Sequence, residues 1–356
     1  MLLASLLVAA CGSTPSPEAP ATGKGGVTVV DALGRTVEFE TPPQRIVVAG
    51  RSSLTIINTL YLFAEAQDRV TGLVVGRQKP GKFLAFVDPD FDQKTVLEVE
   101  AGPEQIATLN PDVVIVRSFM QEKLGKPLEQ VDIPVVYVDL ETPEQYFRDV
   151  MVLGQLFDNE ARAEEIQAFY QARLDQLDEG LGGLADEQKP RVLIVQYSDQ
   201  GGEVALNVPS ASWLQTTEAE LAGGLPIWKE AAQSGGWTVV SFEQIAAWDP
   251  DQVFVISYGA DPAQVVAELE ASSQWQALRA VQEGQLYGFA ADVYSWDQPD
   301  PRWILGTTWL ASKIHPGRLE GLDLMDEVSQ FFGQMYGLDD ASVQEQIVPL
   351  LKGDVE

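Results

Sequence analysis

The amino-acid sequence predicts an α/β protein built from two Rossmann-like lobes, joined by a single long helix and separated by a ligand cleft. Three observations support this fold class. The 356 residues are enough for two domains of ordinary size. Short apolar strands alternate with helices in both halves of the chain, and one helix–turn–strand segment occurs twice.

The first predicted lobe spans residues 27–142 and begins with two short strands around the Ala-Leu-Gly turn at 32–34. Beyond Pro42-Pro43, apolar runs predict strands at 45–50, 70–75, 113–116 and 135–138, and helical patterns at 52–67, 103–109 and 121–131. Because such alternation is typical of βαβ units, we expect these strands to form a parallel sheet.

Two helices without an intervening strand follow, at 143–157 and 159–182. The second would be about 36 Å long at about 1.5 Å per residue, which is enough to bridge two lobes. We therefore interpret 143–187 as linking helices. Strands and helices alternate again from Arg191 to about His315, so 188–356 is predicted to be the second lobe with its terminal helices.

The repeated segment is the strongest internal signal in the chain. Residues 104–116 align without a gap with residues 243–255, and eight of the 13 positions are identical. Each copy reads as a short helix, a stop at Asx-Pro where a helix cannot continue, and a buried strand. The repeat predicts two lobes of related architecture.

The N-terminal segment has the composition of a targeting sequence. Residues 1–10 are apolar and end in small residues before Cys11, the only cysteine, and Val8-Ala9-Ala10-Cys11 resembles a bacterial lipobox. We expect residues 1–11 to be a lipoprotein signal with Cys11 as the lipidated anchor. The basic residues that usually open a signal peptide are missing, which indicates a start codon further upstream. Residues 12–26, rich in Gly, Ser, Thr, Pro and Ala, are expected to be a flexible tether.

Composition and missing motifs exclude several functions. Acidic residues outnumber basic ones 53 to 23, and a net charge of −30 disfavours nucleic acid as a partner. The sequence has no Gly-x-Ser-x-Gly elbow, phosphate-binding Gly-x-x-x-x-Gly-Lys or Cys/His pair, so we expect no enzyme and no catalytic residues. His315 is the only histidine, which argues against a site for a bare metal ion.

Arginines and aromatic residues near predicted strand ends are the candidate ligand-binding residues. Arg51, Arg77 and Arg117 follow three strands of the first lobe, at the edge where open parallel sheets bind ligands. Their forked donors suit carboxylate, phosphate or oxyanion groups. In loops of the second lobe, rings that could pack on a chelate or macrocycle are Tyr197, Trp213, Tyr258, Tyr294 and Trp296.

Several motifs together resemble those of the binding proteins of ABC importers for iron-siderophores, heme and cobalamin, the class III periplasmic binding proteins. The motifs are Asp31-Ala32-Leu33-Gly34-Arg35, Pro42-Pro43-Gln44-Arg45-Ile46-Val47, the repeat, Pro301-Arg302-Trp303-Ile304-Leu305-Gly306 and His315-Pro316. The resemblance covers nearly the whole chain beyond the tether. It implies two α/β lobes, one long connecting helix and small closing motions.

The resemblance also implies roles for individual residues. Glu104 and Glu243, one in each copy of the repeat, match the surface glutamates that dock onto permease arginines. Trp237, six residues before Glu243, matches a tryptophan that stacks on cobalamin. Glu98 stands at the corresponding place in the first lobe, and a carboxylate there disfavours cobalamin, although we still count Glu98 among the cleft residues.

The expected protein is therefore a lipid-anchored, extracytoplasmic binding protein that acts as a monomer and delivers a solute to an ABC permease dimer with its ATPase. The expected ligand is a ferric siderophore-type chelate, or heme or a corrinoid, with no resident cofactor or metal. Two alternatives stay open. One is a molybdate or tungstate oxyanion-binding protein of the same class, and the other is a surface sensor that kept the binding fold.

Overall fold

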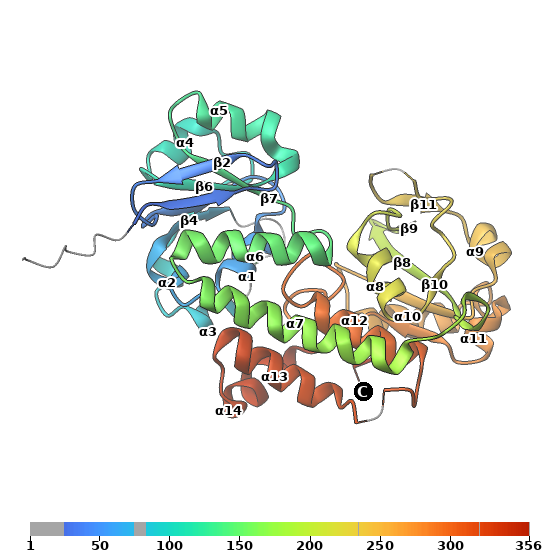
Figure 1. Ribbon diagram of the computed structural model, residues 1–356. Coiled ribbons are helices and arrows are strands. Elements are labelled where there is room, and N and C mark those ends of the chain that lie inside the picture. Colours follow the sequence, from blue (N-terminus) through green and yellow to red (C-terminus); the bar gives the residue numbers. More distant parts are fainter. Residues whose placement is uncertain (1–24, 75–82, 234, 320, 356) are drawn as a thin grey trace, which may run out of the picture.

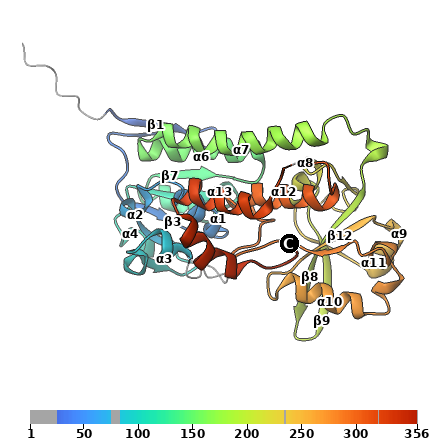
Figure 2. The same cartoon turned by 90° about the horizontal axis from the view of Figure 1, so that it is seen from below.

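Two α/β lobes lie side by side and are spanned along one side by long helices (Figures 1 and 2). The computed structural model describes residues 25–74, 83–233, 235–319 and 321–355. The predicted lipidation site at Cys11 and the predicted ligand residue Arg77 lie outside these ranges. None of the helices within them is both long enough and apolar enough to cross a membrane.

The first lobe is built on a five-stranded parallel sheet in the order β5-β4-β3-β6-β7. Its strands are β3 (Ile46–Val48), β4 (Val70–Val74), β5 (Thr95–Leu97), β6 (Val113–Arg117) and β7 (Val135–Val138). The central strands β3 and β6 are buried at every position, as expected for a sheet covered by helices on both faces. An antiparallel hairpin of β1 (Val27–Val30) and β2 (Thr36–Phe39) precedes the sheet, as predicted.

Short helices connect these strands, namely α1 (Ser53–Leu60), α2 (Ala66–Arg69), α3 (Phe83–Val87), α4 (Pro103–Ala107) and α5 (Lys126–Glu129). The single helix predicted for 52–67 is wrong, because α1 ends at Leu60. Backbone bonds from Leu62 to Thr59 and from Phe63 to Leu60 replace the α-helical pattern there. Tyr61, Leu62 and Phe63, at the break, are all buried in the core.

The linking helices are α6 (Pro143–Phe157) and α7 (Glu160–Leu181), close to their predicted bounds. Each has a side-chain cap, because the Thr142 hydroxyl accepts from the Gln145 N–H and the Asn159 amide oxygen accepts from the Arg162 N–H. α7 runs past both lobes and is the long connection that the sequence predicted (Figure 1).

The second lobe contains a sheet in the order β11-β9-β8-β12-β13, with β10 paired to β8. Its strands are β8 (Arg191–Gln200), β9 (Glu203–Val208), β10 (Leu225–Pro226), β11 (Thr238–Val240), β12 (Gln252–Ile256) and β13 (Leu286–Gly288). Its helices are α8 (Leu214–Leu221), α9 (Phe242–Trp248), α10 (Pro262–Ala271), α11 (Arg279–Gln282) and α12 (Trp303–Ile314). Strands β8, β12 and β13 are parallel, whereas β9 runs antiparallel to β8 and β11.

The C-terminal helix α13 (Leu324–Tyr336) lies beside α7 and reaches the first lobe, and the short helix α14 (Asp340–Ser342) follows it (Figure 1). The rings of Tyr336 and Phe83 meet edge to face with centroids 4.9 Å apart. The Tyr336 hydroxyl donates to the carbonyl of Asn58 at 3.1 Å. The sequence analysis assigns these helices to the second lobe, whereas in the structure Tyr336 packs against the first lobe.

The two copies of the repeat fold alike, as α4 with β6 and as α9 with β12. Asn110 and Asp249, the residues before the two prolines, both adopt left-handed conformations, with φ of 47° and 43°, which Asn and Asp tolerate better than most residues. The next aspartate of each copy holds the neighbouring strand in place. Asp112 accepts from the Arg45 N–H at 2.9 Å, and Asp251 accepts from the Arg191 N–H at 2.7 Å.

Candidate ligand-binding site

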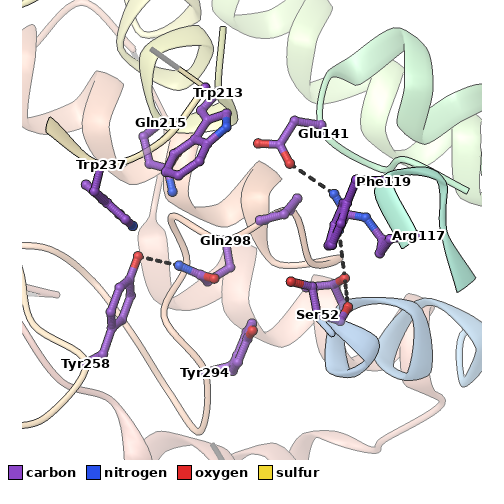
Figure 3. A pocket seen from close by; sticks show the side chains of 13 residues that line it. Ser52, Arg117, Phe119, Glu141, Trp213, Gln215, Trp237, Tyr258, Tyr294 and Gln298 are labelled. Atoms are coloured by element: carbon purple, nitrogen blue, oxygen red, sulfur yellow. Dashed lines mark hydrogen bonds and ion pairs between the residues drawn. The ribbon is translucent and has the colours of Figure 1, made fainter. Parts of the chain in front are cut away.

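A cavity of about 620 Å³ lies between the two lobes (Figure 3). The first lobe lines it with Ser52, Thr55, Arg117, Phe119 and Glu141, and the second with Trp213, Gln215, Gly235, Trp237, Tyr258, Tyr294, Gln298 and Pro299. The first-lobe residues follow the carboxyl ends of β3, β6 and β7. In the second lobe, Tyr258 follows β12 and Tyr294 follows β13. The cavity thus forms where open parallel sheets bind their ligands.

Arg117 is the cation of the first-lobe wall. It is the last residue of β6 and only 5% exposed. Its Nη1 donates to the Thr55 hydroxyl at 3.1 Å and its Nη2 to Glu141 Oε2 at 3.0 Å, while its buried Nε has no hydrogen-bond partner. An unpaired buried donor is costly. The Nε is thus an unsatisfied donor in the buried part of this wall.

Glu141 joins the two lobes across the cavity. Its Oε2 accepts from Arg117, and its Oε1 accepts from the backbone N–H of Leu214, the first residue of α8, at 3.3 Å. Burial raises the pKa of this carboxyl, and the charge of Arg117 partly opposes that rise. The cavity wall thus contains a carboxylate that contacts the donors of both lobes.

Aromatic rings dominate the second-lobe wall. Trp213 and Trp237 meet edge to face with centroids 5.5 Å apart, and Trp237 meets Tyr258 with centroids 6.4 Å apart. Tyr294 lies lower in the same view (Figure 3). Rings held in this way present flat, polarisable surfaces to a ligand, with few rotatable bonds to order on binding.

Two carboxyl groups lie buried close to this wall. Asp297 accepts hydrogen bonds from Gln215 at 3.0 Å, from Tyr258 at 2.6 Å and from Gln298 at 3.0 Å, which fixes these three cavity side chains. Burial raises the pKa of Asp297. The oxygens of Glu218 have no hydrogen-bond partner. Burial, followed by the charges of Asp297 and Glu141, raises the pKa of Glu218 well above its ordinary value, which favours the neutral acid.

A second buried arginine, Arg302, lies in a cluster that connects the lobes. Its Nε contacts both oxygens of Asp292, at 2.8 and 2.9 Å, and its Nη1 donates to Asp300 at 3.0 Å. Asp300 also accepts from Asn58 of α1 in the first lobe. The Phe83 ring lies 4.5 Å from the guanidinium carbon. This cluster explains the Pro301-Arg302-Trp303 motif as a structural one.

The structure brings together half of the residues predicted to bind the ligand. Five line the cavity, namely Arg117, Trp213, Trp237, Tyr258 and Tyr294. Four described residues do not line it. Arg51 is exposed and paired with Glu100 at 3.0 Å, Glu98 is exposed after β5, and Tyr197 is half-buried in β8. Trp296 is fully buried, with its indole N–H donating to Asp292 at 3.1 Å.

Sequence reasoning missed the polar residues that complete the cavity, namely Ser52, Thr55, Glu141, Gln215 and Gln298. Glu141 follows β7 just as Arg117 ends β6, so the rule of strand ends could have found it had acidic residues been considered. Ser52 carried another signal that only a structure reveals, a left-handed backbone with φ of 56°. Such strain is frequent at ligand sites.

The geometry suits binding better than metal coordination. Among the described residues, no cluster of three or more His, Cys, Asp or Glu side chains could hold a metal ion. His315 lies away from the cavity, with its ring nitrogen 3.1 Å from the carbonyl oxygen of Gly223. The residues that line the site supply one cation, a set of polar side chains and a wall of rings.

A two-lobe fold with such a cleft defines an α/β solute-binding protein. The chain belongs to the periplasmic binding protein family, whose profile matches residues 66–293, more than half of the chain. It is thus a substrate-binding protein of the kind that serves ABC transporters outside the cytoplasm.

Individual relatives are distant but cover most of the chain. The molybdate-binding protein MolA of Haemophilus influenzae is 23% identical over 94% of this chain and 97% of its own length. An iron-uptake system-binding protein of Bacillus subtilis is 24% identical over 82% of this chain and 89% of its own length. The crystal structure of a periplasmic solute-binding protein from Veillonella parvula superimposes with a TM-score of 0.73 at 22% identity, over 91% of this chain and 97% of that one.

Proposed function

We propose that this protein captures an organic ferric chelate with anionic groups and delivers it to an ABC permease. The observation that carries the proposal is the cavity itself, with an arginine on one wall and rings on the other. Its volume of about 620 Å³ lies within the range of pockets for organic ligands, about 300 to 1,000 Å³. Arg117 suits a carboxylate or catecholate oxygen, while Trp213 and Trp237 suit the flat apolar parts of a chelate. The iron-uptake relative supports a ligand that contains iron.

A second candidate is an oxyanion such as molybdate, which the relative from Haemophilus influenzae favours because the alignment covers nearly the whole of both chains. Arg117 could bind an oxyanion as readily as a carboxylate. A tetrahedral oxyanion would, however, leave most of the cavity and its rings without contacts. We therefore place the organic chelate first.

Purified protein, stripped of any ligand under denaturing conditions and refolded, tests the choice. We expect ferric citrate or a ferric siderophore to bind, as seen by native mass spectrometry and by a change in tryptophan fluorescence, since Trp213 and Trp237 line the cavity. Heme, cobalamin, molybdate and tungstate complete the panel. Binding of molybdate alone would favour the oxyanion, and binding of none of these compounds would contradict the proposal.

We infer that Glu104 and Glu243 dock the protein onto the permease. Both side chains are exposed in the first turns of α4 and α9. The pKa of Glu243 is lowered by hydrogen bonds from its own backbone N–H and from the Ser241 hydroxyl, which favours the charged form that an arginine would bind.

Replacing both docking glutamates with alanine tests this role. We expect ligand affinity to stay within about twofold of the wild type, because neither residue lines the cavity, while uptake into cells falls about tenfold or more. The matched control is Glu164→Ala with Glu179→Ala, which removes two exposed glutamates of α7. Normal uptake by the docking variant would contradict the assignment. If deletion of the whole protein also left uptake unchanged, the two results together would favour a surface sensor.

Two further features complete the proposal. Val8-Ala9-Ala10-Cys11 supports a lipid anchor at Cys11. Cys11→Ser should move the protein from the membrane fraction to the soluble fraction, and an unchanged distribution would exclude this anchor.

We also propose that the protein acts as a monomer, since both walls of the cavity come from one chain. A dimer mass in light scattering at micromolar concentration would contradict this.

A further inference from the structure

Glu141 occupies a set of donors that would suit the anionic group of a ligand. One carboxylate oxygen contacts Arg117 of the first lobe and the other contacts the Leu214 N–H of the second, at 3.0 and 3.3 Å. These two oxygens on one atom reproduce the O–C–O or O–X–O geometry of a carboxylate or an oxyanion. The carboxylate lies inside the cavity, where such a ligand would be held.

The donors around Glu141 form more than a single ion pair. Leu214 begins α8, an eight-residue helix, and its N–H donates to Glu141 from the end of the helix that favours negative charge. Independently of that helix, the buried Nε of Arg117 has no partner although its two terminal nitrogens are bonded. The donors that Glu141 contacts thus come from both lobes.

Charge prevents Glu141 and an anionic ligand from sharing the site. A ligand carboxylate at Arg117 would bring a second negative charge against the guanidinium that Glu141 already contacts at 3.0 Å. Glu141 can leave, because its side chain is 25% exposed, whereas Asp297 is fully buried. Its departure would also release the contact with Leu214 that joins the two lobes.

We propose that Glu141 is a built-in competitor, an internal carboxylate that holds Arg117 and the N-terminus of α8 until the carboxylate or oxyanion group of a ligand displaces it. This inference rests on the proposed binding of an anionic solute in the cavity. The competitor lowers the net affinity for an anionic ligand, because the contacts that Glu141 loses on displacement offset part of what the ligand gains at Arg117. It makes Glu141 a determinant of specificity that weakens the binding of every anionic ligand.

Calorimetric titration of the Glu141→Gln variant tests the proposal with three probes. Gln keeps the size and the oxygen acceptor of the side chain but removes its charge. Ferric citrate and molybdate, if they are ligands, should each bind the variant at least about tenfold more tightly than the wild type. The reason is that the ligand no longer has to replace a charge-assisted hydrogen bond. A ferric trihydroxamate chelate without carboxylates should bind the variant and the wild type alike. The two anionic arms distinguish a chelate carboxylate from a free oxyanion. Glu144→Gln is the matched control, because it removes an exposed carboxylate three residues away and should change no affinity.

The outcomes separate this inference from the proposed function. If the wild type binds ferric citrate or molybdate and Glu141→Gln binds it within twofold, the competitor is refuted while the binding function stands. Binding of the trihydroxamate alone would likewise refute the competitor. If neither protein binds any probe, the proposed function falls and the inference falls with it.

A measurement on the unaltered protein guards against a variant that misfolds. In a crystal structure of the wild type with ferric citrate or molybdate, the Glu141 carboxylate should have left Arg117, with a ligand oxygen in its place. A ligand-bound structure that keeps the Arg117–Glu141 contact at 3.0 Å would contradict the proposal.

Discussion

Two buried arginines between the lobes, Arg302 and Arg117, have contrasting surroundings. Arg302 is fully buried, contacts two aspartates, and lies against the rings of Phe83, Phe332 and Tyr336. Arg117 is 5% exposed, contacts one glutamate and one threonine, and faces a cavity. The same side chain type is enclosed in one region and left open in the other.

The difference separates a structural residue from a binding residue. Both carboxylates beside Arg302 come from the loop 292–300. Asn58 of the first lobe donates a hydrogen bond to one of them, Asp300, so the cluster connects the two lobes. Arg117 borders the cavity, and the side chain of its partner Glu141 is 25% exposed and can move away. A cluster of the first kind should govern stability, and one of the second kind should govern affinity.

The largest effect is expected for Arg302→Gln on stability. Removing the guanidinium leaves the buried carboxylates of Asp292 and Asp300 without their cation, which costs about 3–5 kcal/mol of the free energy of unfolding. Urea denaturation followed by circular dichroism measures the loss. Arg279→Gln, at an arginine whose side chain is 39% exposed and paired with Asp251, should cost less than about 1 kcal/mol. Equal losses of unfolding free energy in the two variants would contradict the structural role of Arg302.

A somewhat smaller effect is expected for Arg117→Ala, on affinity rather than stability. Loss of the charged donors, with Glu141 left as an unpaired negative charge in the cavity, should weaken an anionic chelate by about 2–4 kcal/mol, or about 30-fold or more. Arg51→Ala is the control, since Arg51 is exposed and lies outside the cavity. If both variants bound the chelate with wild-type affinity, the assignment of Arg117 as a ligand-binding residue would be wrong.

The smallest effect is expected for Trp237→Ala, which removes one ring from the second-lobe wall. We expect about 1–2 kcal/mol of lost binding energy, or about tenfold, because the neighbouring ring of Trp213 stays in place. The control Tyr197→Ala removes an aromatic ring of the same lobe that does not line the cavity. A larger loss for Tyr197→Ala, in a variant that is still folded, would place the ligand elsewhere.

The sequence predicted the architecture well because local patterns carry it. Both copies of the repeat form a helix and a buried strand, and the linking helices α6 and α7 have nearly their predicted bounds. The break after α1 was missed, because the run of apolar residues at 60–63 fits one long helix as well as a turn. Only the backbone hydrogen bonds of Leu62 and Phe63, which reach back three residues, distinguish the two.

The site was predicted in part, because a strand end indicates where a residue lies but not which way it points. Arg117 ends the central strand β6 and reaches the cavity, whereas Arg51 follows β3 and turns outward to Glu100. Trp296 was indistinguishable by type from Trp237, yet Asp292 holds it in the core. The contact between Glu141 and Leu214 joins residues 73 positions apart in sequence, and no sequence pattern predicts it.

The most direct test of the central claim is a crystal structure of the wild-type protein with a ferric chelate that it binds in solution. We predict that the chelate occupies the cavity between the lobes, with an anionic oxygen within hydrogen-bonding distance of Arg117 and an apolar part against Trp213 or Trp237. A chelate bound outside this cavity, or bound within it without contacting Arg117, would contradict the account.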